Sequence, residues 1–387
     1  MQCKILFITG DRSEYDLLKP VAKELSSYKQ FKLGFFVAGT HLIEKFGRTI
    51  DVIENDGFEI VSKINNLLLS DSPSARAKSL SIELASLVDT IDTYKPAMVV
   101  VLGDREETLA AAIACVYSRT ICVHLCGGDT TSDGNSDNLV RDAVTKMAHI
   151  HFPSTEKSRK RILDLGEESY RVFNYGATGI DSLVNVEQMS KTELLKSLGV
   201  NEDYKRFAVL IQHPILTDIE QSIADLRASL VALREIGIPT FVGRTNSDPG
   251  NMAFREILNS WCGENDTFHF YGNLDRIKFV NLLRHASVLV GNSSLGIIEA
   301  PYLKLPVVNV GLRQRGRESG ENVIFVDGKK EDVHAAIIKA TEDDLYRGVI
   351  ESGTNPYGYG IASKLIAKKL SEILPDLDKF RLKMQVK

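Results

Sequence analysis

The sequence has no apolar run long enough to cross a membrane as a helix. Such a helix needs about 18 or more consecutive apolar residues, and no stretch of this 387-residue chain approaches that length. The apolar residues at the start of the chain, 1–10, are followed at once by Asp11, Arg12 and Glu14. They therefore predict a first β-strand rather than a signal peptide.

Cysteine is scarce, and neither sign of charge is in large excess. Five cysteines at irregular spacing are typical of reduced thiols, which favours a cytoplasmic location. The 47 Lys and Arg residues and the 51 Asp and Glu residues give a net charge of −4. This balance argues against general nucleic-acid binding, which needs a basic surface, but it allows a local cationic pocket for a nucleotide.

The usual glycine-rich phosphate-binding loops are also missing at the point where they would be expected. The loop after the first apolar run matches neither G-x-G-x-x-G nor G-x-x-x-x-G-K-[ST], the fingerprints of dinucleotide and P-loop sites. The remaining composition is ordinary, with 43% hydrophobic and 25% charged residues. It suits a globular protein of two domains, each with its own core.

Short apolar runs alternate with helix-like stretches, which predicts α/β domains with parallel sheets covered on both faces. Strands of the first half are expected at residues 4–9, 32–38, 97–102, 121–125 and 150–153. Strands of the second half are expected at residues 206–212, 240–242, 268–271, 288–290 and 307–310.

The strand pattern predicts two doubly wound, Rossmann-like domains, at residues 1–176 and 177–360. A C-terminal segment, 361–387, is expected to form a helix that packs back on the first domain. Ligands of doubly wound folds bind at the carboxyl ends of the strands. We therefore expect the active site in the cleft between the two domains.

Charged residues follow two of the expected strands in the first half. Arg12 lies near the start of a helix, where an anion is favoured; the alternative is a solvated loop. Asp104 and Arg105 follow the most apolar strand of the chain, where charges are costly without a partner or a function. The alternatives for these two are a structural ion pair and a helix N-cap.

Residues 124–142 hold the densest group of reactive side chains. Asp129 and Asp137 are candidates for an acid and a base whose environments separate their pKa values, and Gly127 and Gly128 let the backbone approach a ligand. A metal site is the competing hypothesis, because ligand types occur nearby at Cys122, His124, Cys126, His149 and His151. Their spacing does not form a closed tetrahedral site, so we expect no metal.

Polar residues also follow strands of the second half. Ser293 and Ser294 predict a diphosphate site of hydroxyls and backbone N–H groups, or alternatively a helix N-cap. Glu299 suits the two hydroxyls of a ribose, and His213 suits a phosphate. A cationic wall for phosphate, or a solvated loop, is expected from the nearby Arg313, Arg315 and Arg317.

Eight motifs occur in order along nearly the whole chain: TGDRSEYDLLKP at 9–20, GTHL at 39–42, GDR at 103–105, GGD at 127–129, DNLVRDAVTK at 137–146, QHPILTD at 212–218, GNSSLGIIEAP at 291–301 and RQRGRESGENV at 313–323. As a set they resemble hydrolysing UDP-N-acetylglucosamine 2-epimerases, which begin sialic acid and related nonulosonic acid pathways. The non-hydrolysing relatives usually open with a GTRPE-type loop and lack the block around residues 127–146. The resemblance therefore favours the hydrolysing branch.

The resemblance implies a fold of the GT-B type, with catalysis on the first domain and UDP binding on the second. It implies that the catalytic carboxylates are Asp104, Asp129 and Asp137. It further implies UDP contacts by Arg12, Arg105, His213, Asn246, Leu274, Ser293, Ser294, Glu299 and Arg313.

The implied reaction removes the C2 proton of UDP-N-acetylglucosamine as UDP leaves C1, which forms a 2-acetamidoglycal. Water then adds, and C2 is reprotonated on the opposite face to give N-acetylmannosamine. This reaction needs no cofactor and no metal, and its partner is the UDP-sugar rather than a nucleic acid or a membrane. The resemblance also implies a homo-oligomer, a dimer or a tetramer.

The sequence departs from the family pattern at three aspartates. Asp129 replaces the usual Glu, Asp142 stands where His is usual, and Asp16 stands where a small hydroxyl residue is common. The block around residues 127–146 also carries two extra residues. An alternative substrate is therefore one changed at C4 or C6, such as the UDP-2,4-diacetamido-2,4,6-trideoxyglucose of legionaminic acid synthesis. A non-hydrolysing 2-epimerase, a GT-B glycosyltransferase and a non-catalytic UDP-sugar sensor remain as further alternatives.

Overall fold

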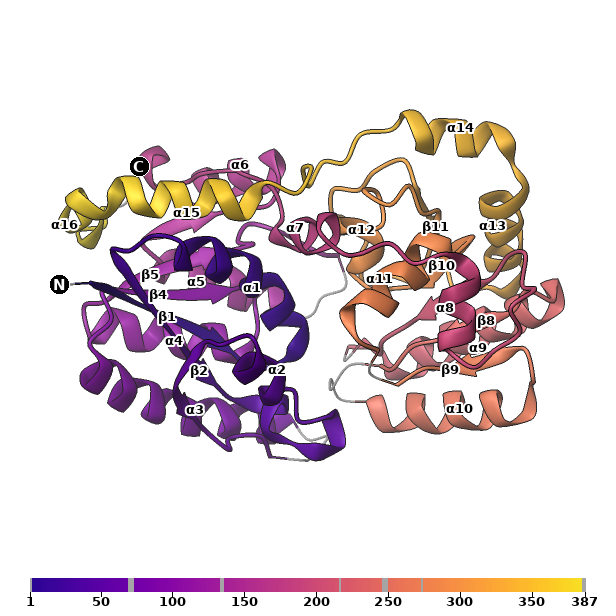
Figure 1. The fold of residues 1–387 in the computed structure, drawn as a ribbon, viewed down its shortest axis with the longest axis horizontal. Coiled ribbons are helices and arrows are strands. Elements are labelled where there is room, and N and C mark those ends of the chain that lie inside the picture. The colour runs from indigo at the N-terminus through magenta and orange to yellow at the C-terminus, as the bar shows by residue number, and fades with distance from the viewer. Residues whose placement is uncertain are drawn as a thin grey trace. The chain divides into compact units, whose positions relative to one another are not determined.

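The computed structural model of the chain consists of two α/β units, drawn in Figure 1. The residues that it describes are 2–68, 73–132, 136–215, 217–245, 250–272 and 274–384. The first unit takes its described residues from Met1–Thr130, Ser136–Ser182 and Tyr357–Lys387, and the second unit takes them from Thr131–Asn135 and Leu183–Pro356. Each unit is built on one six-stranded sheet.

The sheet of the first unit is parallel and has the strand order β3-β2-β1-β4-β5-β6. Its strands are β1 (Cys3–Thr9), β2 (Phe31–Val37), β3 (Glu59–Lys63), β4 (Met98–Leu102), β5 (Ile121–Leu125) and β6 (Ile150–Phe152). The chain moves from β1 to one edge of the sheet and from β4 to the other. The loops after β1 and β4 therefore flank the switch point, where ligands of such folds bind.

The sheet of the second unit is also parallel, in the order β12-β11-β10-β7-β8-β9. Its strands are β7 (Ala208–Ile211), β8 (Thr240–Val242), β9 (Phe268–Phe270), β10 (Val288–Gly291), β11 (Val307–Val310) and β12 (Val323–Val326). Here β7 takes the place of β1 and β10 takes the place of β4. The two units thus share one topology, which confirms the predicted pair of doubly wound, Rossmann-like folds.

Helices connect the strands and cover both faces of each sheet (Figure 1). Those of the first unit are α1 (Arg12–Ser26), α2 (Ile50–Asn55), α3 (Pro73–Tyr94), α4 (Glu106–Tyr117), α5 (Asp137–Met147), α6 (Glu156–Asp164), α15 (Ala362–Ile373) and α16 (Leu377–Arg381). Helix α7 (Thr178–Val184) begins in the first unit and ends in the second. Those of the second unit are α8 (Lys191–Ser197), α9 (Ile219–Ile236), α10 (Asn251–Glu264), α11 (Arg276–His285), α12 (Leu295–Ile298), α13 (Lys330–Glu342) and α14 (Asp344–Ser352). Within the described ranges, no helix is long and apolar enough to cross a membrane.

The strands that the sequence pattern missed lie at sheet edges. β3 and β12 each occupy an edge, and neither contains a fully buried residue. By contrast, every residue of the inner strand β4 is buried. An inner strand is covered on both faces and is therefore nearly all apolar. A half-covered edge strand lacks that continuous run, so the pattern did not reveal it.

The C-terminal part of the chain belongs to the first unit. Figure 1 shows α15, in yellow, lying over α1. Ile366, Leu370 and Phe380 of this segment are buried in the same core cluster as residues of β1 and α1. Burial of these apolar side chains holds the segment to the unit, since a buried Ile, Leu or Phe contributes roughly 1.5–3 kcal/mol.

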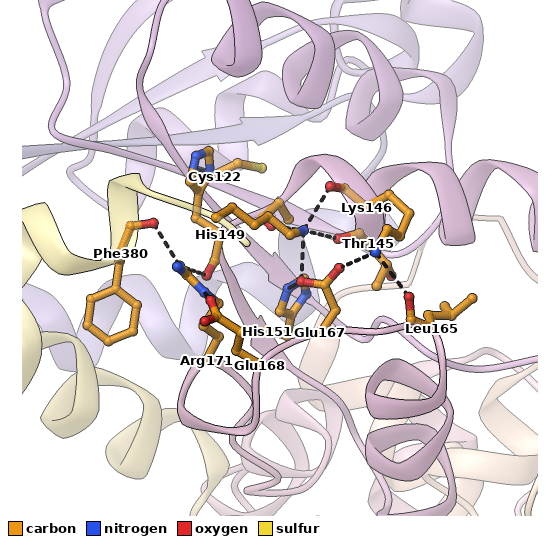
Figure 2. A network of polar contacts seen from close by, with 12 residues as sticks. Cys122, Thr145, Lys146, His149, His151, Leu165, Glu167, Glu168, Arg171 and Phe380 are labelled. Atoms are coloured by element: carbon orange, nitrogen blue, oxygen red, sulfur yellow. Dashed lines mark hydrogen bonds and ion pairs between the residues drawn. The ribbon is translucent and has the colours of Figure 1, made fainter. Parts of the chain in front are cut away.

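A buried polar network also attaches the C-terminal segment (Figure 2). Nζ of Lys383 donates to the backbone oxygens of Thr145, Lys146 and Ala148 at 2.7–2.9 Å, and it pairs with Oε2 of Glu167 at 2.8 Å. The three oxygens belong to the C-terminal end of α5, where a cation is favoured. Lys383 therefore caps the helix that begins at Asp137.

Candidate active site

Two aspartates of the first unit contact one buried arginine, Arg141, and a third stands one helical turn before it. Asp104 follows β4, Asp129 follows β5, and Asp137 is the first residue of α5. Nη2 of Arg141 donates to Oδ2 of Asp104, and Nη1 donates to the backbone oxygen of Asp129 at 2.9 Å. Asp137 stands four residues before Arg141 in α5, on the same helix face. The structure thus gathers the three aspartates at the carboxyl edge of the first sheet.

The carboxylate of Asp129 is held at the start of α6. Its Oδ1 accepts a hydrogen bond from Oγ of Ser158 at 2.6 Å, in the first turn of a helix, where an anion is favoured. Gly128 permits this approach, because its φ is +82° and a Cβ there would lie 2.3 Å from the backbone oxygen of Ser158. Only glycine fits that position, so the close approach seen at Gly128 is to the backbone of α6 and serves to place Asp129. The predicted approach to a ligand stays a prediction.

His124 fixes the turn that carries Asp104. Its Nε2 lies 2.8 Å from the backbone oxygen of Gly103 and therefore carries the proton of this hydrogen bond. Burial lowers the pKa of His124 to about 3, so the ring is neutral near pH 7. In the part of the chain that the structure describes, no three or more His, Cys, Asp or Glu side chains are grouped to hold a metal ion.

The two arginines of the first unit that the resemblance assigns to UDP lie beside acidic side chains. Nε of Arg105 is 3.5 Å from Oε2 of Glu107 and 3.9 Å from Oε1 of Glu14. Nε of Arg12 is 3.9 Å from Oδ2 of Asp16. Arg105 thus offsets the charge of two buried glutamates, a structural contribution that its motif alone did not indicate.

A cluster of buried glutamates near this switch point was missed by sequence reasoning. Glu83 is fully buried, and Glu14 and Glu107 are 5% and 6% exposed. Burial is the main cause that raises the pKa of all three, and repulsion from Glu107 adds to it at Glu14 and Glu83. Glu83 lies four residues before the core residue Leu87 in α3. That helical spacing is the sequence signal for its burial.

Replacing Glu83 by glutamine is expected to stabilise the protein at alkaline pH. Because the pKa of Glu83 is raised in the fold, this carboxyl contributes stability below its ordinary pKa, and the contribution is lost as the pH rises through the raised value. Glutamine stays neutral and keeps an acceptor for Nδ2 of Asn66, which now donates to Glu83 at 2.8 Å. We expect Glu83→Gln to melt about 2–4 °C above the wild type at pH 8, the shift that about 1 kcal/mol produces.

Thermal unfolding followed by circular dichroism at several pH values between about 4 and 8 measures this difference, which should shrink toward the acidic end. Asp89→Asn is the matched control, because Asp89 is an exposed acid on the same helix. A Glu83→Gln protein that melts below the wild type at pH 8 would contradict the expectation.

In the second unit, Asn292 joins three of the predicted UDP-binding loops, although sequence reasoning did not single it out. Its Oδ1 accepts from the backbone N–H of His213 at 2.8 Å, and its Nδ2 donates to the backbone oxygen of His213 at 2.9 Å. Its own backbone oxygen accepts from Nη1 of Arg313 and Nε2 of Gln314. The sequence signal for this contact was the position of the two residues, because Asn292 follows β10, His213 follows β7, and these strands are neighbours in the sheet.

The remaining predicted UDP residues of the second unit that the structure describes follow β9 or β10. Glu299 is 8% exposed, and its Oε1 accepts from Nη2 of Arg276 at 3.2 Å. Ser293 and Ser294 precede the four-residue helix α12, and Ser294 makes no side-chain capping hydrogen bond. Leu274 is partly buried just before α11. Asn246 lies outside the described residues.

The three arginines after β11 do not share one environment. Arg313 donates to the backbone oxygen of Asn292, and Nη1 of Arg317 donates to Oε1 of Gln314 at 3.0 Å. Arg315 pairs instead with Asp327 at 2.6 Å, and both side chains are exposed to solvent. Two of the three thus lie at the loop that holds Asn292, while Arg315 fits the solvated alternative.

A family model places the chain among known proteins. The model described as UDP-N-acetylglucosamine 2-epimerase matches residues 23–371. The chain belongs to this family. The family inferred from the eight motifs is thereby confirmed.

Two relatives are identical to this chain at about a third of the aligned positions. The chain is 34% identical over 338 residues to the GDP/UDP-N,N'-diacetylbacillosamine 2-epimerase (hydrolyzing) of Campylobacter jejuni, with 87% of each chain covered. It is 33% identical over 370 residues to the UDP-N,N'-diacetylbacillosamine 2-epimerase (hydrolyzing) of Legionella pneumophila, with 96% of each chain covered.

A solved structure of the Neisseria meningitidis UDP-GlcNAc 2-epimerase bound to UDP-GlcNAc has the same fold. Its TM-score with this chain is 0.79 at 20% identity, and the match covers 95% of this chain and 100% of the other. At that identity the likeness supports the fold alone.

Proposed function

We propose that this protein is a hydrolysing 2-epimerase that converts UDP-2,4-diacetamido-2,4,6-trideoxyglucose (UDP-N,N'-diacetylbacillosamine) and water to UDP and the free 2-epimeric sugar. The observation that carries the proposal is the set of three aspartates at the carboxyl edge of the first sheet, two of which Arg141 contacts, in a chain of the 2-epimerase family. The choice of sugar is supported by the Campylobacter and Legionella relatives, whose names give this substrate. UDP-N-acetylglucosamine, the substrate that the resemblance implies, is the second candidate substrate because the family model carries its name.

The proposed chemistry needs a base and an acid on opposite faces of the sugar. A carboxylate takes the C2 proton while the bond from C1 to the UDP oxygen breaks, which gives UDP and a 2-acetamidoglycal. Water then adds its oxygen to C1 and passes one proton to a carboxylate, and a carboxylic acid delivers a proton to C2 from the opposite face. Asp104, Asp129 and Asp137 supply these groups. Such proton transfers contribute roughly 10²–10⁴-fold each to the rate.

The proposal assigns the leaving UDP to the predicted contacts. His213 and Arg313 are tied to each other through Asn292, so a diphosphate bound beside them would meet fixed charges and donors rather than mobile ones. Preorganised groups of this kind stabilise the charge that develops on a leaving group. Ser293, Ser294, Glu299, Leu274, Asn246, Arg12 and Arg105 complete the proposed UDP contacts.

Proton NMR of the purified protein in D₂O tests the reaction. The protein is incubated in parallel with UDP-2,4-diacetamido-2,4,6-trideoxyglucose and with UDP-N-acetylglucosamine. Release of UDP together with a free 2-epimer that carries deuterium at C2 is the expected result with the first substrate. A 2-epimer that is still attached to UDP would indicate a non-hydrolysing epimerase, and a greater rate with UDP-N-acetylglucosamine would reassign the sugar. If neither substrate reacts, the proposed function is wrong.

Glu299→Ala is expected to weaken UDP binding at least tenfold. The carboxylate of Glu299 is assigned to the ribose hydroxyls, and a hydrogen bond to a charged group contributes roughly 1.5–3 kcal/mol. Isothermal titration calorimetry with UDP and with 2′-deoxy-UDP measures the effect. The wild type should prefer UDP, and the variant should bind both ligands alike.

Glu256→Ala is the matched control, because Glu256 is an exposed glutamate on α10 of the same unit. An unchanged Kd of Glu299→Ala for UDP would refute the ribose assignment.

A further inference from the structure

Arg141 occupies a position where an apolar side chain would be expected. It lies on the buried face of α5, between Asp137 and the buried residues Val144 and Thr145, and is itself 2% exposed. Burying a guanidinium costs several kcal/mol before its partners offset the cost, and apolar residues often replace such groups without loss of stability. Stability alone therefore does not explain an arginine at this place.

The two ends of the Arg141 guanidinium contact loops that follow different strands. Nη2 binds the carboxylate of Asp104 after β4, and Nη1 binds the backbone oxygen of Asp129 after β5. The guanidinium is planar and rigid, so two contacts made by its separate nitrogens fix the spacing of the two loops. The Asp104 side chain is 21% exposed, so it stays accessible to solvent although Arg141 binds its carboxylate.

Other groups already perform the purely structural tasks nearby. His124 holds the backbone of Gly103 at 2.8 Å, which fixes the main chain of the turn before Asp104. Asp142, the next residue of α5, pairs with Arg161 of α6 at 2.5 Å and so links those helices. The task that remains for Arg141 is to set the direction in which the Asp104 carboxylate points relative to Asp129.

We propose that Arg141 is a positioning residue that holds the carboxylate of Asp104 and the main chain of Asp129 in the geometry the epimerisation requires. The inference rests on the proposed function. Arg141 acts through Asp104 and Asp129 rather than through the substrate. Its removal should therefore lower kcat and leave the binding of UDP unchanged. Misplacement of a reacting group by about 1 Å can cost roughly 10²-fold in rate.

The test compares Arg141→Lys and Arg141→Met with the wild type. Lysine keeps the charge but has a single nitrogen, so it cannot reproduce the two-point contact. We expect kcat to fall at least tenfold in Arg141→Lys and further in Arg141→Met. In both variants KM should stay within about threefold, and the Kd of UDP, measured by calorimetry, should stay within about twofold. Hydrogen exchange of α5 amides in each variant checks that the first unit, which carries Arg141, is folded.

A double-mutant cycle with Asp104→Asn separates positioning from a general structural effect. If Arg141 acts through Asp104, Arg141→Lys should slow the Asp104→Asn protein far less than it slows the wild type. Equal slowing in both backgrounds would overturn the inference, as would a wild-type kcat in Arg141→Lys. A wild type that releases no UDP from either UDP-sugar would instead overturn the proposed function, and this inference with it.

Discussion

Replacing Asp104 by asparagine is expected to lower the turnover of the UDP-sugar at least tenfold, within the roughly 10²–10⁴-fold range of general acid–base catalysis. The amide has nearly the shape of the carboxylate, but it cannot take a proton from carbon. The Kd of UDP should change by no more than a few fold. Release of UDP measured under saturating substrate, together with calorimetry of UDP binding, gives both quantities.

Asp129→Asn and Asp137→Asn are expected to reduce turnover at least tenfold as well, because the reaction needs both a base and an acid. Asp142→Asn is the matched control. It lies on α5 next to Arg141 but pairs with Arg161 at 2.5 Å, so its turnover should be that of the wild type. Any of the three aspartates whose asparagine variant keeps wild-type turnover has no acid–base role.

Replacing Lys383 by methionine is expected to destabilise the first unit by about 3 kcal/mol. This is the lower end of the range for removing one partner of a buried ion pair, because Lys146 and His151 remain beside Glu167 at 3.0 and 3.2 Å. The Glu167 side chain is fully buried. Without Lys383, the Glu167 carboxylate and the three backbone oxygens at the end of α5 each lose a hydrogen-bond donor.

Urea unfolding followed by hydrogen exchange measures this loss separately in the two units. Amides of α5 and α15 should exchange faster in Lys383→Met. The fluorescence of the single tryptophan, Trp261 of α10 in the second unit, should report an unchanged transition. Lys368→Met is the matched control, because Lys368 is a largely exposed lysine of α15. A Lys383→Met protein as stable as this control would contradict the expected role.

The effect of Lys383 should also depend on pH. Burial alone would raise the pKa of Glu167, but hydrogen bonds from His151 and Lys383 lower it to about 2. The carboxylate therefore contributes its full stability above its ordinary pKa of about 4.3, and the contribution is lost as the pH falls from there toward 2. The difference between wild type and Lys383→Met should hold from about pH 8 to pH 5 and narrow below about pH 4.

Much of the candidate site could be predicted from sequence because the fold is parallel. Asp104, Asp129 and His213 each stand just after an apolar run. The ends of parallel strands lie at one edge of their sheet, which places Asp104 and Asp129 at that edge of the first sheet and His213 at that edge of the second. The departure from the family pattern at Asp142 was harder to interpret, because its partner Arg161 is on another helix. No local pattern indicated that this aspartate links α5 to α6.

The sequence by itself determined the two doubly wound sheets, the family and the loops that carry the candidate residues. Buried strands, strand-to-helix loops and motifs are local features of the chain, and their order along it suffices. Only the tertiary structure decided which charges are partners. Arg141 binds Asp104, 37 positions away, and Lys383 caps Thr145, 238 positions away. Such pairings depend on which residues the fold brings close together. The free energy that selects them comes from burial of the paired groups. A local sequence pattern does not show which residues become buried together.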